Sequence, residues 1–177
     1  MTTTFEVFGQ VHKSILWGNI DGNKIFNTLE NEIRNIHTEI IEIDLNSIES
    51  FDQEFINTVF IKTLQIVESL GGKKSVIFTN IKNGEITYQI SIALKRNNYF
   101  VLYKSGNVFK LIGDVSLQKK NILQKIEKRK QFSKEDICIQ ESTDSCECNS
   151  DIEKFVRLGY LNKNEKDVYN SRLLEFV

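Results

Sequence analysis

The hydrophobic and polar positions in the first half of the chain predict a buried strand that leads into a long helix. Ile41, Ile43 and Leu45 alternate with polar positions, which is the period of a strand. Apolar residues from Phe55 to Leu70 then recur at spacings of three and four, which is the period of a helix with a wide apolar stripe. We therefore expect Ile43 and Phe55 to lie in the core.

The residues before this central strand show weaker patterns of the same kinds. Phe5 to Val11 and Ser14 to Trp17 read as two short strands or one bent strand. A helical pattern from Ile25 to Ile36 follows Asp21, which is placed to accept hydrogen bonds from the first free amides of that helix. We expect this helix to pack back on the sheet.

The residues after the central helix continue the alternation. Gly71-Gly72 is suited to end that helix in the left-handed conformation. Ser75 to Thr79 is typical of a strand buried on both faces, and we expect it to lie parallel to the central strand. Ile86 to Arg96 is helical in period, and two apolar runs at 99–103 and 108–112 flank a Gly-containing link that indicates a hairpin.

Strands that alternate with helices predict an α/β fold with a mostly parallel sheet and helices packed on it. We expect the N-terminal strands and the last hairpin to supply antiparallel edges. This α/β domain is expected to span residues 1–114, because the sequence becomes strongly charged after Gly113-Asp114.

Residues 115–177 read as a smaller second domain. A charged helix at 117–130 is followed by a short helix after a Ser133 cap, with Ile137 and Ile139 as its apolar residues. A polar loop from Glu141 to Asp144 precedes a third helix at about 152–158, and Tyr160-Leu161 with Val168 to Phe176 form a two-stranded wing. Three helices followed by a wing are the layout of a winged helix-turn-helix.

Composition excludes a partner chosen by overall charge. Lys and Arg number 23 and Asp and Glu 24, so nucleic-acid binding needs a local basic patch. The first helix of the second domain offers one, although such a run is also typical of a solvated helix face. Its candidate DNA-binding residues are Lys119, Lys120, Lys125, Lys128, Arg129 and Lys130.

The residue types of catalytic and metal sites are sparse. His12 and His37 have no neighbouring Ser, Cys or Asp at the spacing of a triad. Cys138, Cys146 and Cys148 do not form paired Cys-x-x-Cys motifs, and we interpret them as reduced thiols rather than a zinc site or a disulfide framework. Since no nucleotide-binding motif is present either, we expect no metal, no cofactor and no enzymatic activity.

The chain also lacks the marks of a membrane protein. No apolar run approaches the roughly 20 residues that span a bilayer, and the Thr-rich start differs from a signal peptide. We expect a cytoplasmic location.

The run IEIDLNSIESFDQEF resembles a segment of STAS domains, the anti-sigma-factor antagonist fold, and is closer to a STAS-like bacterial family of unknown function. In these domains a central strand ends in an Asp, passes a short loop and enters a helix. The resemblance spans about residues 5–112 and depends on Asp44, Ile48, Phe51, Asp52 and Phe55. It implies a regulatory protein that acts by binding another protein, with a GHKL-type ATP-binding protein as the implied partner.

One departure from the STAS pattern changes what the resemblance implies. The position at the helix start that accepts phosphate in phosphorylatable STAS proteins holds Gln53, followed by Glu54. Because neither side chain has a hydroxyl, the phosphoryl switch of that family is not expected here. Asp52 and Glu54 either imitate a phosphate by their fixed negative charge or cap the helix in the ordinary way.

Residues 115–177 are similar to winged-helix domains that follow STAS-like domains in some bacterial proteins. The run Val156 to Leu161 resembles the end of a recognition helix that turns into the wing. The acidic residues Glu147, Asp151 and Glu153 within the expected recognition stretch would face phosphates unfavourably. A DNA-binding transcriptional regulator is therefore the second hypothesis, behind protein binding.

The sequence predicts that a partner protein binds at the carboxyl ends of the parallel strands, where strand-to-helix loops are exposed. Either the aromatic side chains there are exposed anchors, or they are buried and the acidic residues only cap the helix. The candidate partner-binding residues are Ser50, Phe51, Asp52, Gln53, Glu54 and Phe55.

Overall fold

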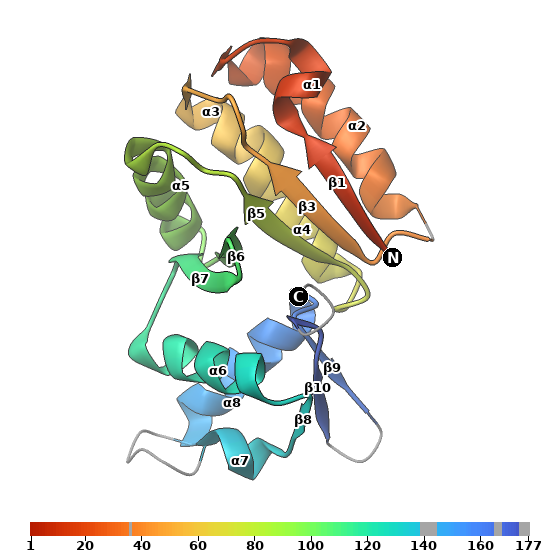
Figure 1. The fold of residues 1–177 in the computed structure, drawn as a ribbon, viewed down its shortest axis with the longest axis vertical. Helices are drawn as coiled ribbons and strands as arrows, with labels where there is room; N and C mark the ends of the chain where they lie inside the picture. Colours follow the sequence, from red (N-terminus) through yellow and green to blue (C-terminus); the bar gives the residue numbers. More distant parts are fainter. Residues whose placement is uncertain (36, 139–144, 165–167, 174–177) are drawn as a thin grey trace.

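The computed structural model describes residues 1–35, 37–138, 145–164 and 168–173, without the side chains of 145–147 (Figure 1). Most of the chain up to residue 113 forms a mixed α/β structure around a five-stranded sheet in the order β1-β3-β5-β6-β7. A two-stranded sheet pairs β2 with β4. The strands are β1 Thr2–Glu6, β2 Ile15–Leu16, β3 Ile40–Asp44, β4 Ser50–Phe51, β5 Ser75–Thr79, β6 Phe100–Ser105 and β7 Val108–Gly113.

The central strands and the final hairpin agree with the sequence prediction. β3 and β5 are parallel, with Ile43 opposite Phe78, and β6 pairs antiparallel with β7. The expected antiparallel N-terminal edge is wrong, because β1 pairs with β3 in parallel. Helix α2, Asn23–Arg34, lies between β1 and β3 in the chain, and a crossover through a helix returns the chain in the same direction.

The N-terminal strand is also shorter than expected. It ends at Glu6, and Val7–Val11 forms the short helix α1 instead. Val7 and Val11 lie four residues apart, so their spacing suits a helix as well as a strand.

The longer helices of this part of the chain pack beside the sheet (Figure 1). The central helix, residues 53–69, contains α3 Gln53–Phe55, the π-helical turn η2 Ile56–Ile61 and α4 Lys62–Ser69. It is preceded in the chain by η1 Gly18–Gly22 with α2 Asn23–Arg34, and followed by α5 Gly84–Arg96. Ile43 and Phe55 are fully buried, which confirms the expected core.

Asp21 does not cap α2 as expected. The helical turn begins earlier, at Gly18, so Asp21 lies inside it and not before it. The Asp21 carboxylate accepts hydrogen bonds from Lys13 Nζ at 2.8 Å and from the Trp17 amide at 3.1 Å. Burial opposes the charged form, but these bonds outweigh it and lower the pKa of Asp21.

The C-terminal module, residues 117–173, has its own three-stranded sheet in the order β8-β10-β9. Ser133 begins its second helix as expected, since Ser133 Oγ accepts from the Asp136 amide. Its elements are α6 Leu117–Lys128, β8 Gln131–Phe132, α7 Lys134–Cys138, α8 Ser145–Arg157, β9 Leu161–Lys163 and β10 Tyr169–Ser171. The sequence predictions for Ile36, Ile139, the loop 141–144 and Phe176 fall outside the described residues.

The expectation of reduced cysteines is wrong for two of them. Cys138 at the end of α7 and Cys148 on α8 are joined by a disulfide, with their Cα atoms 6.2 Å apart. The sequence has no Cys-x-x-Cys pair, and the two thiols come from different helices, so their pairing depends on the tertiary structure.

The side chain of Tyr160 anchors the C-terminal module to two strands of the large sheet. Its hydroxyl donates to the Val76 carbonyl at 2.8 Å and accepts from the Leu102 amide at 3.3 Å. The pairing of β5 with β6 begins at Ile77 and Leu102, so the hydroxyl bridges the strands where their own pairing starts. Tyr160 is completely buried and packs with Phe100 and Phe155.

Two glycines allow this close approach. Gly159 has a φ of +77°, and a Cβ at this position would collide with the Lys74 carbonyl oxygen. Gly72 has a φ of +79°, and a Cβ there would collide with the Val156 carbonyl oxygen. Only a residue without a Cβ meets both requirements, so the end of α8 packs directly on the backbone that leads into β5.

A group of polar side chains fastens α8 to the central helix at the edge of this contact. Glu68 accepts from Tyr99 Oη at 2.7 Å and from Lys154 Nζ at 2.9 Å, and Arg157 lies 3.4 Å away. Burial alone would raise the pKa of Glu68, but the bonds from Lys154 and Tyr99 outweigh it and lower that pKa below 4.5. The same burial and the bond to Glu68 raise the pKa of the Tyr99 hydroxyl.

Replacing Tyr160 by Phe should destabilise the whole chain. The Val76 carbonyl and the Leu102 amide would lose their partner inside the protein, which costs about 1–3 kcal/mol. Chemical denaturation measures this loss, and the exposed Tyr88 supplies the control, since Tyr88→Phe should change the unfolding free energy by less than about 0.5 kcal/mol. Equal stability of the two variants would contradict the bridging role.

Glu68 and its partners should make the unfolding free energy depend on pH. Because its pKa is lower in the folded chain, Glu68 stabilises the fold above pH 4.5, and this contribution disappears as pH falls through the folded value. We expect Glu68→Gln to lose about 1–2 kcal/mol at pH 7 relative to wild type, with the gap closing below pH 4.5. Denaturation from pH 7 to 3 measures the gap, with Glu153→Gln, on the exposed side of α8, as control. A gap that does not change with pH would refute this account.

Candidate functional site

The start of the central helix is fixed by one carboxylate. Asp52 Oδ1 accepts from the Phe55 amide at 2.7 Å and from the Gly18 amide at 3.0 Å. Asp52 therefore caps the helix, which is one of the two alternatives that the sequence left open, and it also ties the helix to the turn at Gly18. A change at Asp52 would disturb both elements.

The two aromatic candidates at this site are not exposed anchors. Phe55 is fully buried and Phe51 is 6% exposed. Phe51 stacks on Phe55 with ring centroids 5.6 Å apart, and both rings contact Phe60, which packs on Phe78 of β5. Their place in this aromatic cluster corrects the prediction that they contact a partner.

Other apolar side chains are exposed beside the helix start. The pairing of β2 with β4 sets Leu16 opposite Phe51, both buried, so the residues on either side of Leu16 face outward. Ile15 is 47% exposed and Trp17 is 53% exposed. Ile20, on the turn that begins after Trp17, is 66% exposed.

Gly18 brings this apolar segment against the central helix. A Cβ on Gly18 would collide with the backbone between Glu54 and Phe55, so the close approach requires glycine. Trp17 precedes Gly18 directly and therefore lies next to the helix start. We define the helix-start surface as Ile15, Trp17, Ile20, Gln53 and Glu54, the last two of which are exposed.

Of the six residues that the sequence proposed for partner binding, Gln53 and Glu54 are the two exposed ones. Ser50 is partly buried, and its amide donates to the Ser14 carbonyl. The sequence did not indicate Trp17 and Ile20 as exposed binding residues. The apolar run from Ile15 to Trp17 fits equally well a strand that is buried on both faces. The available signal was Trp17-Gly18, since a glycine marks a place where a neighbouring backbone comes close.

A shallow hollow of about 540 Å³ lies at the same edge of the sheet. The loops that follow β3 and β5 form it together with α1, whose Phe8 is 37% exposed. It lies where ligands gather in sheets of this type. Its other lining residues are Ser14, Ser47, Ile48, Glu49, Lys82 and Asn83.

Two of the six basic residues proposed for DNA binding, Lys119 and Lys125, are engaged within the protein. Lys119 is 8% exposed, and its ammonium lies 2.6 Å from Asp114 and 3.6 Å from Asp151, so its prediction as a DNA-binding residue is wrong. Lys125 donates to the carbonyls of Asp136 and Ile137 at 3.2 and 2.6 Å. The exposed basic residues are Lys120, Lys128, Arg129 and Lys130.

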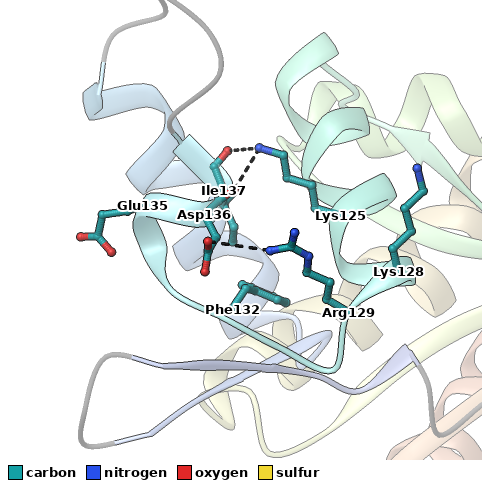
Figure 2. A pocket seen from close by; sticks show the side chains of 7 residues that line it. All are labelled: Lys125, Lys128, Arg129, Phe132, Glu135, Asp136 and Ile137. Carbon is teal, nitrogen blue, oxygen red and sulfur yellow. Dashed lines mark hydrogen bonds and ion pairs between the residues drawn. The ribbon is translucent and has the colours of Figure 1, made fainter.

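A pocket of about 380 Å³ lies between the end of α6 and α7, and Figure 2 shows the side chains that line it. Phe132 and Ile137 are its buried apolar residues. Arg129 lies 3.8 Å from Asp136, whereas Lys128 and Glu135 point away from the centre of the pocket. Lys125 and Arg129 are thus already held by Asp136 and by the Asp136 and Ile137 carbonyls.

One face of helix α8 is buried within the protein. Ile152, Phe155 and Leu158 are buried, and the cationic residues Lys154 and Arg157 pair with Glu68 of the central helix. A helix that reads DNA must present its side chains to the major groove. The face of α8 that carries Phe155 and Lys154 instead packs on the α/β part of the chain.

The described residues contain no group of three or more His, Cys, Asp and Glu side chains arranged to hold a metal ion. None of the helices formed by these residues has both the length and the apolar character needed to cross a bilayer.

Comparison with known proteins yields no assignment. No family model matches the chain, and neither a curated protein nor a solved structure matches it significantly.

We expect no tight binding to duplex DNA, since one face of α8 packs against the protein, its expected recognition stretch is acidic, and Lys119 and Lys125 of α6 are engaged within the protein. Fluorescence anisotropy with random-sequence duplexes at physiological salt should give a dissociation constant of about 10⁻⁶ M or weaker. Selection from random duplexes supplies the decisive check. Recovery of a sequence bound at about 10⁻⁸ M or tighter would make DNA recognition the correct reading.

Proposed function

We propose that this chain is a non-enzymatic bacterial regulatory protein that binds a partner protein through the helix-start surface. The observation that carries the proposal is the exposed Trp17, held beside Gln53 and Glu54 by the Asp52 cap and the Gly18 contact. Tryptophan is enriched among the residues that dominate binding energy in protein interfaces. Ile15 and Ile20 extend its apolar area.

The proposal includes a STAS-like fold for the α/β part and a winged-helix-like fold for the C-terminal module. The order of parallel strands and the entry into the central helix at Asp52 support the first. The order α6, β8, α7, α8, β9, β10 supports the second. By the resemblance to STAS proteins, a GHKL-type ATP-binding protein is the proposed kind of partner, and the cytoplasm is the proposed location.

The proposed interaction does not depend on phosphorylation at the helix start. Gln53 stands where STAS proteins carry the acceptor serine, and Thr58 lies buried inside the helix. The fixed negative charge of Glu54 at the first turn is favoured by the helix dipole. We therefore propose that the surface binds its partner without prior phosphorylation.

Site-specific photo-crosslinking in cells of the source organism tests the proposal. A benzophenone amino acid at position 17 should trap a specific protein that the same group at the exposed position 88 does not trap. With that protein purified, Trp17→Ala should weaken binding at least about 30-fold, because an anchor of this kind contributes about 2 kcal/mol or more.

The control variant is Tyr88→Ala, which removes an aromatic residue of similar exposure on α5. Both variants should keep the wild-type unfolding free energy within about 1 kcal/mol, since both side chains are half exposed or more. Unchanged binding by a folded Trp17→Ala variant would refute the proposed surface.

A further inference from the structure

A polar groove lies beside the helix-start surface, between the central helix and α5. It is an open hollow of about 390 Å³. Ile61 and Ala93 close its floor with buried apolar groups. Gln53 lies in both the groove and the helix-start surface, so the two regions are continuous.

The polar side chains that line this groove have a distinctive chemistry. Four are carboxamides, two are cations, and no carboxylate lines it. Carboxamides present donors and acceptors together, which suits the N–H and C=O groups of a peptide backbone. These six residues are Gln53, Asn57, Gln65, Asn97, Lys62 and Arg96.

Arg96 is the main charged group of the groove. It is exposed in the last turn of α5, and none of the described residues forms an ion pair with it. The ammonium of Lys62 instead lies 5.4 Å from the ring centroid of Phe26, so part of its charge is directed toward α2. A free guanidinium binds a carboxylate through two parallel hydrogen bonds.

The carboxamides are partly free to bind a ligand. Asn97 uses its amide nitrogen to donate to the Ala93 carbonyl at 2.8 Å, which leaves its oxygen as an acceptor. Gln53 and Asn57 contact each other at 3.4 Å, a long hydrogen bond that a ligand can replace. The helix from Gln53 to Gln65 rises about 18 Å, which matches about five residues of extended chain.

We propose that this groove binds an acidic, extended peptide segment of the partner protein, with one carboxylate on Arg96 and its backbone on the carboxamides. The proposal rests on the proposed function, because the segment belongs to the protein that the neighbouring Trp17 contacts. The groove supplies the charge preference, and the apolar surface supplies most of the binding energy.

NMR titration of the whole chain tests the groove without the partner. The probes are three blocked pentapeptides, Glu-Ala-Glu-Ala-Glu, Gln-Ala-Gln-Ala-Gln and Lys-Ala-Lys-Ala-Lys. The Glu peptide should shift the side-chain amide signals of Gln53, Asn57, Gln65 and Asn97 with a dissociation constant of about 1 mM. The Gln and Lys peptides should not shift these signals. Arg96→Gln should weaken the Glu peptide about tenfold, the effect of one charge-assisted contact.

The matched control is Lys95→Gln, which removes an exposed charge next to Arg96 but outside the groove, and it should leave the titration unchanged. The proposal fails if no shift occurs, if the Gln peptide shifts the signals equally, or if Arg96→Gln and Lys95→Gln behave alike. It also fails if inorganic phosphate reproduces the shifts with equal affinity, since the site would then be one for small anions.

Trp17→Ala separates this proposal from the proposed function. It should leave the peptide titration unchanged while it weakens the whole partner. A negative titration together with Trp17-dependent partner binding rejects the groove alone. A positive titration together with Trp17-independent partner binding rejects the helix-start surface alone.

Discussion

The hydroxyl of Tyr160, placed between the Val76 carbonyl and the Leu102 amide, joins the two parts of this chain into one interior. A hydroxyl buried this deeply must have partners, and here both partners are backbone groups of the large sheet. Gly159 and Gly72 supply the space, and Glu68 with Lys154 closes the edge. The C-terminal module is therefore packed on the large sheet through buried groups.

This arrangement divides the sheet into a covered end and a free end. Tyr160 and Gly159 meet β5 and β6 near Lys74, Val76 and Leu102, which is the end where both strands begin. The opposite end carries the loops after β3 and β5 and the start of the central helix. The C-terminal module therefore does not cover the carboxyl ends of the strands. Among the described residues, loops and exposed apolar side chains lie together at that end.

The sequence predicted best where one side-chain period was long and unambiguous. The run from Ile41 into the central helix, β5, α5 and the last hairpin all agree with their patterns. The strand prediction for Val7–Val11 was wrong because a spacing of four fits both a strand and a helix. The prediction that Asp21 caps α2 was wrong because a π-helical turn starts three residues before Asp21. Local patterns do not contain the tertiary contacts that decide such cases.

The structure changes which side chains near the start of the central helix are exposed. Phe51 and Phe55 look like anchors in sequence because they flank an acidic loop, yet the core needs them against Phe60 and Phe78. Trp17 is exposed because β2 pairs with β4, a contact between residues more than 30 positions apart. The Cys138–Cys148 disulfide and the role of Tyr160 escaped for the same reason, since each depends on how the helices pack.

The geometry around Asp52 also bears on how such a surface would work. One carboxylate oxygen accepts from both the Gly18 and Phe55 amides, so the turn that carries Trp17 and the helix that carries Glu54 have a fixed distance between them. A surface held in this way loses little conformational entropy when a partner binds, which favours affinity. In the proposed function, Gln53 offers no hydroxyl for a phosphoryl switch at the helix start, so the geometry fixed by Asp52 is what we propose the partner recognises.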